Sequence, residues 1–145
     1  MCLLGVNCRY DGGGKAIPEL EELMELAELI PVCPETLGGL PTPRTPSERK
    51  DGRVVSRDGR DVTEAFRRGA GEALKLAELF GVNCALLKER SPSCGSGMIY
   101  DGSFSGGLIP GDGVTAELLK ANGIAIFGES RIQELIDMLG REKEL

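Results

Sequence analysis

The sequence contains no histidine, and aromatic residues make up only 4% of its 145 residues. Without imidazole there can be no Ser-His-Asp triad, no Cys-His nucleophile pair and no histidine-ligated zinc or iron. Any proton transfer must therefore use Glu, Asp, Lys, Tyr, Ser or water.

The chain also lacks an excess of positive charge, with 17 Lys and Arg against 23 Asp and Glu and a net charge of −6. No basic face that could neutralise phosphates is visible, and there are few aromatic side chains on which bases could stack. The composition argues against nucleic-acid binding and favours a small, polar or uncharged substrate.

Long apolar segments are absent as well. No run approaches the roughly 20 residues that cross a bilayer, and residues 1–13 lack the basic start and apolar stretch of a signal peptide. We therefore expect a cytoplasmic protein without a membrane partner. In a reducing compartment, its five cysteines are expected to be free thiols or metal ligands rather than a disulfide framework.

Length and a 41% hydrophobic content predict a single domain over residues 1–145. Apolar side chains at helical spacing predict helices over 18–30, 61–80 and 114–121, and a last one after Ser130. Short apolar runs predict buried strands within 29–35, 82–89 and 124–127. This alternation predicts an α/β fold with a Rossmann-like, mainly parallel sheet flanked by helices. A small β-hairpin insertion is expected around residues 53–63, turning at Asp58-Gly59.

The cysteines fall where such a fold gathers ligands, beyond the carboxyl ends of the strands. Cys33 ends the first predicted strand, Cys94 lies a few residues beyond the second, and Cys2 and Cys8 flank the first apolar stretch. Cys84 lies inside a predicted strand and is expected to pack in the core. We therefore expect a cysteine site at one edge of the sheet.

No two cysteines form a C-x-x-C pair, which disfavours a zinc ribbon and a thioredoxin-type redox centre. Three thiolates without histidine suit a soft metal or an iron–sulfur cluster. Two alternatives stay open: a zinc hydrolase with three thiolates and a water, and a module that binds metal or sulfide without turnover. Neither "RYDGGGKA" nor "GSGMIY" completes a nucleotide-binding motif.

Six ordered motifs spread over nearly the whole chain resemble those of the thiouracil desulfidase family: "CLLGVNCRYDGG", "PVCPETLGGLPTPR", "DVTEAFRRGA", "KERSPSCGS", "IYDGSFSG" and "GDGVTAELL". The resemblance implies a [4Fe-4S] cluster held by Cys2, Cys33 and Cys94. It implies Glu35 as an acid/base carboxylate and Ser91 as a proton-relay serine. The implied reaction is non-redox removal of sulfur from a thiolated nucleobase. The open iron would bind the substrate sulfur, and water would attack the adjacent carbon.

The glycine-rich stretch after Cys94 and the polar residues after Cys8 are expected to form the walls of the substrate pocket. The residues proposed to contact substrate are Arg9, Tyr10, Asp11, Ser93, Tyr100, Asp101, Ser103 and Ser105.

The chain departs from the family pattern at its beginning, because relatives usually have an apolar strand before "CLLG". Here the sequence starts at Met1-Cys2. Either the start is misassigned, or the chain is a shortened form, or the sheet has lost its first strand. In the last case Cys2 would lie on a mobile terminus, and Cys8 is a second candidate for the third ligand.

Overall fold

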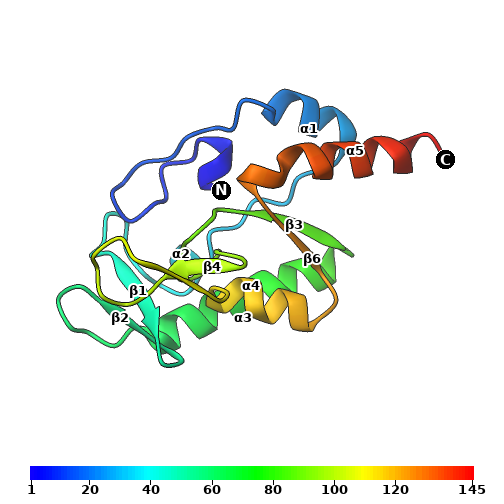
Figure 1. Ribbon diagram of the computed structural model, residues 1–145. Coiled ribbons are helices and arrows are strands. Elements are labelled where there is room, and N and C mark those ends of the chain that lie inside the picture. The colour runs from blue at the N-terminus through cyan, green and yellow to red at the C-terminus, as the bar shows by residue number, and fades with distance from the viewer.

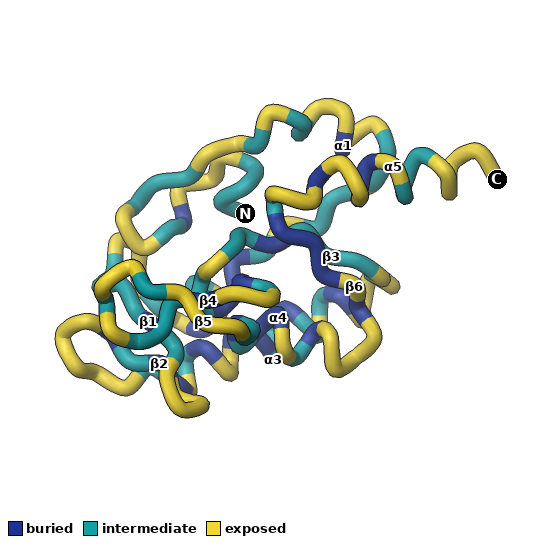
Figure 2. Tube along the Cα trace, in the orientation of Figure 1, coloured by how far each residue is buried: buried dark blue, intermediate teal, exposed yellow.

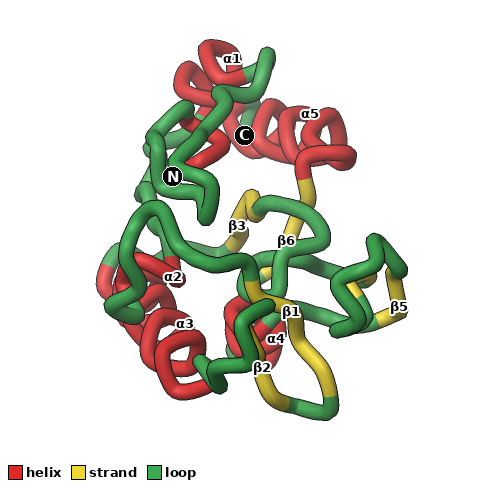
Figure 3. The backbone as a smooth tube through the Cα atoms, turned by 90° about the vertical axis from the view of Figure 1, so that its left-hand side faces the viewer, coloured by secondary structure: helices red, strands yellow, loops and turns green.

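The computed structural model describes residues 1–145 and has three layers (Figures 1 and 3). In the middle lies a parallel pair of strands, β3 (Cys84–Leu87) and β6 (Ala125–Gly128). Helices α1 (Leu20–Leu26) and α5 (Ile132–Lys143) cover one side of this pair. Helices α3 (Thr63–Leu79) and α4 (Val114–Ala121) cover the other. The α/β class is confirmed, with the parallel part of the structure limited to two strands.

Alternating side chains connect each central strand to both helical layers. Leu87 and Ile126 pack against α3 and α4, whereas Leu86 and Phe127 pack against α1 and α5. Figure 2 shows β6 as a buried segment between the layers. The protein therefore has two apolar cores that share one thin sheet.

Two antiparallel hairpins lie beside this centre. The first joins β1 (Ser47–Lys50) to β2 (Arg53–Ser56), and the second joins β4 (Met98–Tyr100) to β5 (Leu108–Pro110). The sequence did not predict the second hairpin, which lies in the glycine-rich stretch.

The hairpin predicted around residues 53–63 is present, and a larger hairpin that shares β2 precedes it. The main turn is Asp51-Gly52, where both residues have positive φ, at 51° and 75°, as a two-residue hairpin turn requires. The predicted Asp58-Gly59 turn brings residues 60–62 back against β2, through the bridge between Val55 and Asp61 and through backbone hydrogen bonds from Ser56 N–H to Arg60 O and from Val62 N–H to Val54 O. The insertion therefore begins one strand earlier than expected.

The prediction of a strand within residues 29–35 is wrong. The backbone is extended at Ala27 and at Cys33, but the intervening residues have no neighbouring strand with which to form a ladder. Helix α2 (Pro34–Leu37) follows at once, and the first residues form a short 3₁₀ helix, η1 (Cys2–Leu4). A second 3₁₀ turn, η2 (Glu129–Arg131), leads from β6 into α5.

The long helices match their predicted ranges closely, although α1 is shorter at both ends. Gly81 and Gly123 have φ of 65° and 79° and end α3 and α4, as expected of left-handed stop residues. None of the helices combines the length and the apolar character needed to cross a membrane.

Helices α2 and α3 touch through two glycines. A Cβ on Gly69 would lie 1.7 Å from the carbonyl oxygen of Pro34, and one on Gly38 would lie 2.0 Å from that of Ala65. Only residues without a side chain allow this approach. The contact fixes Pro34, whose neighbours in the sequence are Cys33 and Glu35.

We predict that Gly69→Ala lowers the free energy of unfolding by about 3 kcal/mol, because the added methyl group would force α2 away from α3. The matched control is Gly71→Ala in the same helix, where a Cβ meets nothing within 4 Å. That change should stabilise the protein by about 0.5–1 kcal/mol through helix propensity. Urea denaturation measures both. Equal effects at the two positions would contradict the close-contact explanation.

Candidate cysteine site

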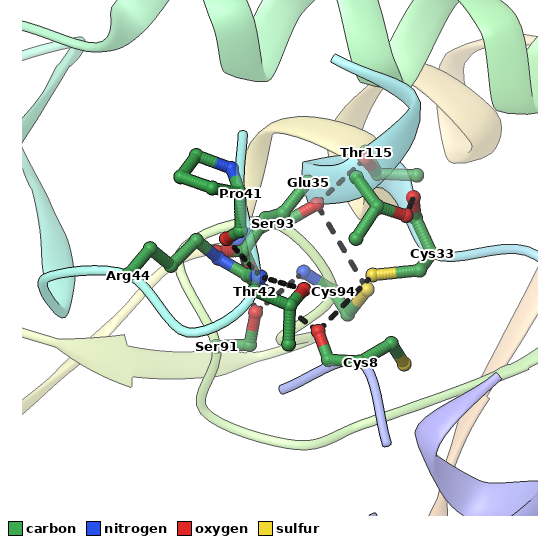
Figure 4. A network of polar contacts seen from close by, with 11 residues as sticks. Cys8, Cys33, Glu35, Pro41, Thr42, Arg44, Ser91, Ser93, Cys94 and Thr115 are labelled. Carbon is green, nitrogen blue, oxygen red and sulfur yellow. Dashed lines mark hydrogen bonds and ion pairs between the residues drawn. The ribbon is translucent and has the colours of Figure 1, made fainter. Parts of the chain in front are cut away.

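A cavity of about 780 Å³ brings together cysteines from distant parts of the sequence. Cys2 at the start of η1, Cys33 just before α2 and Cys94 in the loop after β3 all line it, together with Cys8. All five cysteines are free thiols. In Figure 4 the side chains of Cys33 and Cys94 point toward one another.

The thiols lie in surroundings that disfavour their charged form. Burial raises the pKa of Cys94 to about 12, and the nearby carboxylate of Glu35 adds to the shift. Burial likewise raises the pKa of Cys8 to about 11, with a further contribution from Cys33. Metal ligands bind as thiolates, so a positively charged centre would displace these protons.

The arrangement of the donors distinguishes between kinds of metal centre. No three Cys, Asp or Glu side chains converge closely enough to hold a single metal ion. A zinc ion needs its thiolates around one point, at about 2.3 Å from the metal. A [4Fe-4S] cluster bonds each thiolate to a different iron and so needs them further apart. The donors therefore do not form a single-ion site, whereas the thiols that line the cavity supply the kind of ligand that a cluster takes.

Glu35 lies in the first turn of α2 and lines the same cavity. Its Oε1 accepts a hydrogen bond of 3.2 Å from Nε of Arg44, whereas no hydrogen bond reaches Oε2. Burial raises the pKa of the Glu35 carboxyl, and Arg44 opposes that shift. A carboxyl group with one free oxygen and a pKa shifted toward neutrality suits acid/base chemistry.

Arg44 holds several loops together, a role that the sequence did not predict. Its side chain is only 6% exposed. Besides Glu35, it donates to the carbonyl oxygens of Cys8 at 3.0 Å and Pro41 at 3.1 Å, and its backbone N–H donates to Tyr10. These bonds are drawn in part in Figure 4. The sequence feature that could have pointed to Arg44 is its position directly after two prolines in "LPTPR".

Ser91 and Ser93 have different environments. Ser91 Oγ accepts backbone N–H bonds from Ser93 and Cys94, each 3.1 Å long, and the residue lines the cavity. With both acceptor positions filled, its hydroxyl proton is left to donate elsewhere. Ser93 is fully buried, 2.9 Å from the hydroxyl of Thr115. Its contacts link the Cys94 turn to helix α4.

The other residues predicted to contact substrate divide into two groups. Arg9, Tyr10 and Tyr100 line the cavity, as do the three predicted ligands and both predicted catalytic residues. Outside the lining lie Asp11, Ser93, Asp101, Ser103 and Ser105. Asp11 and Asp101 accept backbone N–H bonds within their own turns.

The wall of the cavity near β4 and β5 is made by Phe104 and Gly106 instead. The backbone N–H groups of Gly102 and Phe104 both donate to Oε1 of Glu48, a buried residue on β1. Phe104 adopts a positive φ of 56°, which costs a residue with a side chain about 1–2 kcal/mol. The two bonds to Glu48 hold it there.

A second residue that the sequence analysis missed is Glu129, at the carboxyl end of β6. One of its oxygens accepts from Lys88 Nζ at 2.7 Å and from the backbone of Glu89. The other oxygen is buried without a hydrogen-bond partner, and the residue lines the cavity. The strand-end rule that singled out Cys33 applies to this position equally well.

Comparison with known proteins assigns the chain to a family. Residues 1–131 match the model of the 2-thiouracil desulfurase family. The chain belongs to this family.

Two proteins illustrate the similarity. The uncharacterised protein YbbK of Bacillus subtilis is 40% identical over 145 residues, covering 93% of this chain and 96% of that protein. A solved structure, the [4Fe-4S]-dependent thiouracil desulfidase TudS, is 48% identical, with a TM-score of 0.90 over 96% of this chain and 93% of the other. The family resemblance of the motifs is thereby confirmed.

We predict that Arg44→Met lowers the free energy of unfolding by about 3 kcal/mol, because it leaves Glu35 partly buried without a partner. The same change in a Glu35→Gln background should cost at least about 1 kcal/mol less, since the unpaired charge is gone. A double-mutant cycle from urea denaturation of the cluster-free protein measures the difference. Strictly additive losses would contradict a direct coupling between the two residues.

Proposed function

We propose that this protein is a [4Fe-4S]-dependent desulfidase that removes sulfur from a thiolated nucleobase such as thiouracil, releasing the oxo product and sulfide. The observation that carries this proposal is the meeting of three free cysteines and a half-paired carboxyl group in one cavity. Family membership and the 48% identical desulfidase support it.

The residues proposed to hold the cluster are Cys2, Cys33 and Cys94, each from a different segment. Three protein ligands leave one iron open, and the bound cluster would supply a Lewis acid that polarises the substrate's carbon–sulfur bond. Cys8 also lines the cavity and is the alternative third ligand; its backbone carbonyl oxygen accepts a hydrogen bond from Arg44 and is approached by the thiol of Cys33.

The chain's own residues supply the proton transfers. Glu35 Oε2 is free to accept a proton from the attacking water, while Arg44 keeps Oε1 in place. The hydroxyl of Ser91, held by two backbone N–H groups, donates its proton toward the departing sulfur. The aromatic rings that line the cavity, those of Tyr10, Tyr100 and Phe104, offer surfaces for a flat substrate. The balance is C=S plus water giving C=O plus hydrogen sulfide, with no electrons supplied.

The same features suit a free small molecule as the substrate. A net charge of −6 gives no attraction for a nucleic-acid backbone. Five free thiols and an oxygen-sensitive type of cofactor fit a reducing, cytoplasmic setting.

We predict that protein purified and reconstituted without oxygen contains about four iron and four sulfide per chain. Cys33→Ala and Cys94→Ala should lose most of this iron. Cys84→Ala, which removes a half-buried, cavity-lining thiol of β3 that is not a proposed ligand, should keep it and serves as the matched control. Zinc in place of iron would favour the hydrolase alternative. Absence of any metal after reconstitution would refute the proposal.

We predict that Glu35→Gln and Ser91→Ala keep the cluster but lower kcat for sulfide release by about 100-fold, the usual size of a lost proton transfer. Ser130→Ala, at an exposed position outside the cavity, is the control and should retain full activity. Sulfide release from 2-thiouracil is the measurement. If a cluster-loaded wild-type protein releases no sulfide from any thiouracil, a non-catalytic binding module becomes the better explanation.

A further inference from the structure

Part of the cavity wall comes from the two antiparallel hairpins. Glu48 on β1, Arg57 just beyond β2 and Phe104 in the turn after β4 all line the cavity. We call these three residues the hairpin wall. Glu48 lies four residues after Arg44, so the Cα atoms of the two are at most about 14 Å apart. Because Arg44 also holds Glu35, a short stretch of chain connects the hairpin wall to the carboxyl group proposed for catalysis.

The backbone of Phe104 has a conformation that is unfavourable for a residue with a side chain. Its φ is 56°, whereas the positive-φ positions on either side of it are glycines, Gly102 at 90° and Gly106 at 84°. A glycine in place of Phe104 would adopt this conformation without strain. Other residues keep such a conformation only where their surroundings hold them, and they gather at functional sites. The phenylalanine ring therefore indicates a gain that offsets the strain.

Glu48 supplies the restraint on this turn. The residue is only 8% exposed, and its Oε1 accepts the backbone N–H groups of Gly102 and Phe104, each at 3.0 Å. Hydrogen bonds to a carboxylate are stronger than those between neutral groups, and a buried carboxylate needs them. Gly102 also packs closely on β1, since a Cβ there would lie 2.7 Å from the Cβ of Lys50. Both contacts fix the turn against the first hairpin.

The ring of Phe104 has one face engaged and one face left. The guanidinium carbon of Arg57 lies 5.5 Å from the ring centroid and covers the first face. Phe104 is half-buried and lines the cavity, so the second face is the surface that it offers there. Aromatic side chains stack favourably on the flat faces of nucleobases. A rigidly held ring beside a few polar groups suits a planar heterocycle.

We propose that the planar ring of the substrate stacks on Phe104, and that Glu48 is the positioning residue that holds Phe104 in place. Phe104 is then a specificity-determining residue, which favours flat rings over saturated rings that carry the same polar groups. The identity of the ring rests on the proposed function. Stacking is equally strong before and after the carbon–sulfur bond breaks, so Phe104 contributes to binding rather than to the chemical step.

The direct test compares the binding of uracil and 5,6-dihydrouracil, which carry the same N–H and carbonyl groups but differ in ring flatness. The reconstituted protein should bind uracil about tenfold more tightly, a ratio expected of base–aromatic stacking. Phe104→Leu should bind both compounds equally. Phe80→Leu changes an exposed phenylalanine outside the cavity and should keep the preference, as the matched control. Equilibrium dialysis measures the affinities. A starting protein without the preference, or a preference that survives in Phe104→Leu, would overturn the proposal.

The positioning role of Glu48 has a separate readout in amide hydrogen exchange. Glu48→Ala should speed exchange at Gly102 and Phe104 by about tenfold or more, and should weaken uracil binding as much as Phe104→Leu does. Glu48→Gln should restore both properties, because its amide oxygen can accept the same two bonds. Faster exchange with unchanged uracil affinity would overturn the positioning role.

Sulfide release supplies the kinetic counterpart. Phe104→Leu should raise KM for 2-thiouracil about tenfold and leave kcat unchanged, as expected when binding common to the ground and transition states is lost. A lower kcat at constant KM would contradict stacking. The dialysis experiment needs no turnover. A protein that prefers uracil through Phe104 but releases no sulfide would therefore refute the proposed function and leave the stacking site standing.

Discussion

The cysteine site depends on the hydrogen bonds that the guanidinium group of Arg44 donates. This group joins the loop that carries Cys8, the helix that carries Glu35 and the turn at Pro41. A buried charge must keep its hydrogen-bond partners, because losing one leaves an unpaired group in an apolar setting. The three segments are therefore held at fixed separations, and Cys33 with them.

Much of the fold could be predicted from local patterns, and the errors have physical reasons. Helical periodicity and the glycine stops placed the long helices correctly. The hairpin region was predicted only in part, because the chain has two Asp-Gly turns seven residues apart, at Asp51 and Asp58, and only the second was recognised. The strand that pairs across the first turn, "SERK", carries charges and gives no apolar signal. The backbone is extended at Ala27 and at Cys33, on either side of residues 29–32, but a strand also needs a partner, which no local pattern reveals.

For the site, the strand-end argument located Cys33 and Cys94, and the family resemblance distinguished Cys2 from Cys8. The structure brings these positions to one cavity, while their roles as ligands stay predictions. Arg44 and Glu129 were missed because their importance comes from what their side chains reach across the fold. The serines and aspartate of the glycine-rich loop were chosen as polar residues near a cysteine, but the hairpin directs Phe104 inward instead.

Phe104 illustrates how the protein divides two tasks between its parts. Its backbone is fixed by Glu48 on β1, and its ring lies under the guanidinium of Arg57, 5.5 Å away, just beyond β2. The shape of the cavity wall is thus set by a peripheral hairpin, whereas the cysteines are positioned by α2, η1 and the turn after β3. Substrate selectivity can consequently diverge between members of the family through changes in that hairpin, while the chemistry at the cysteines is preserved.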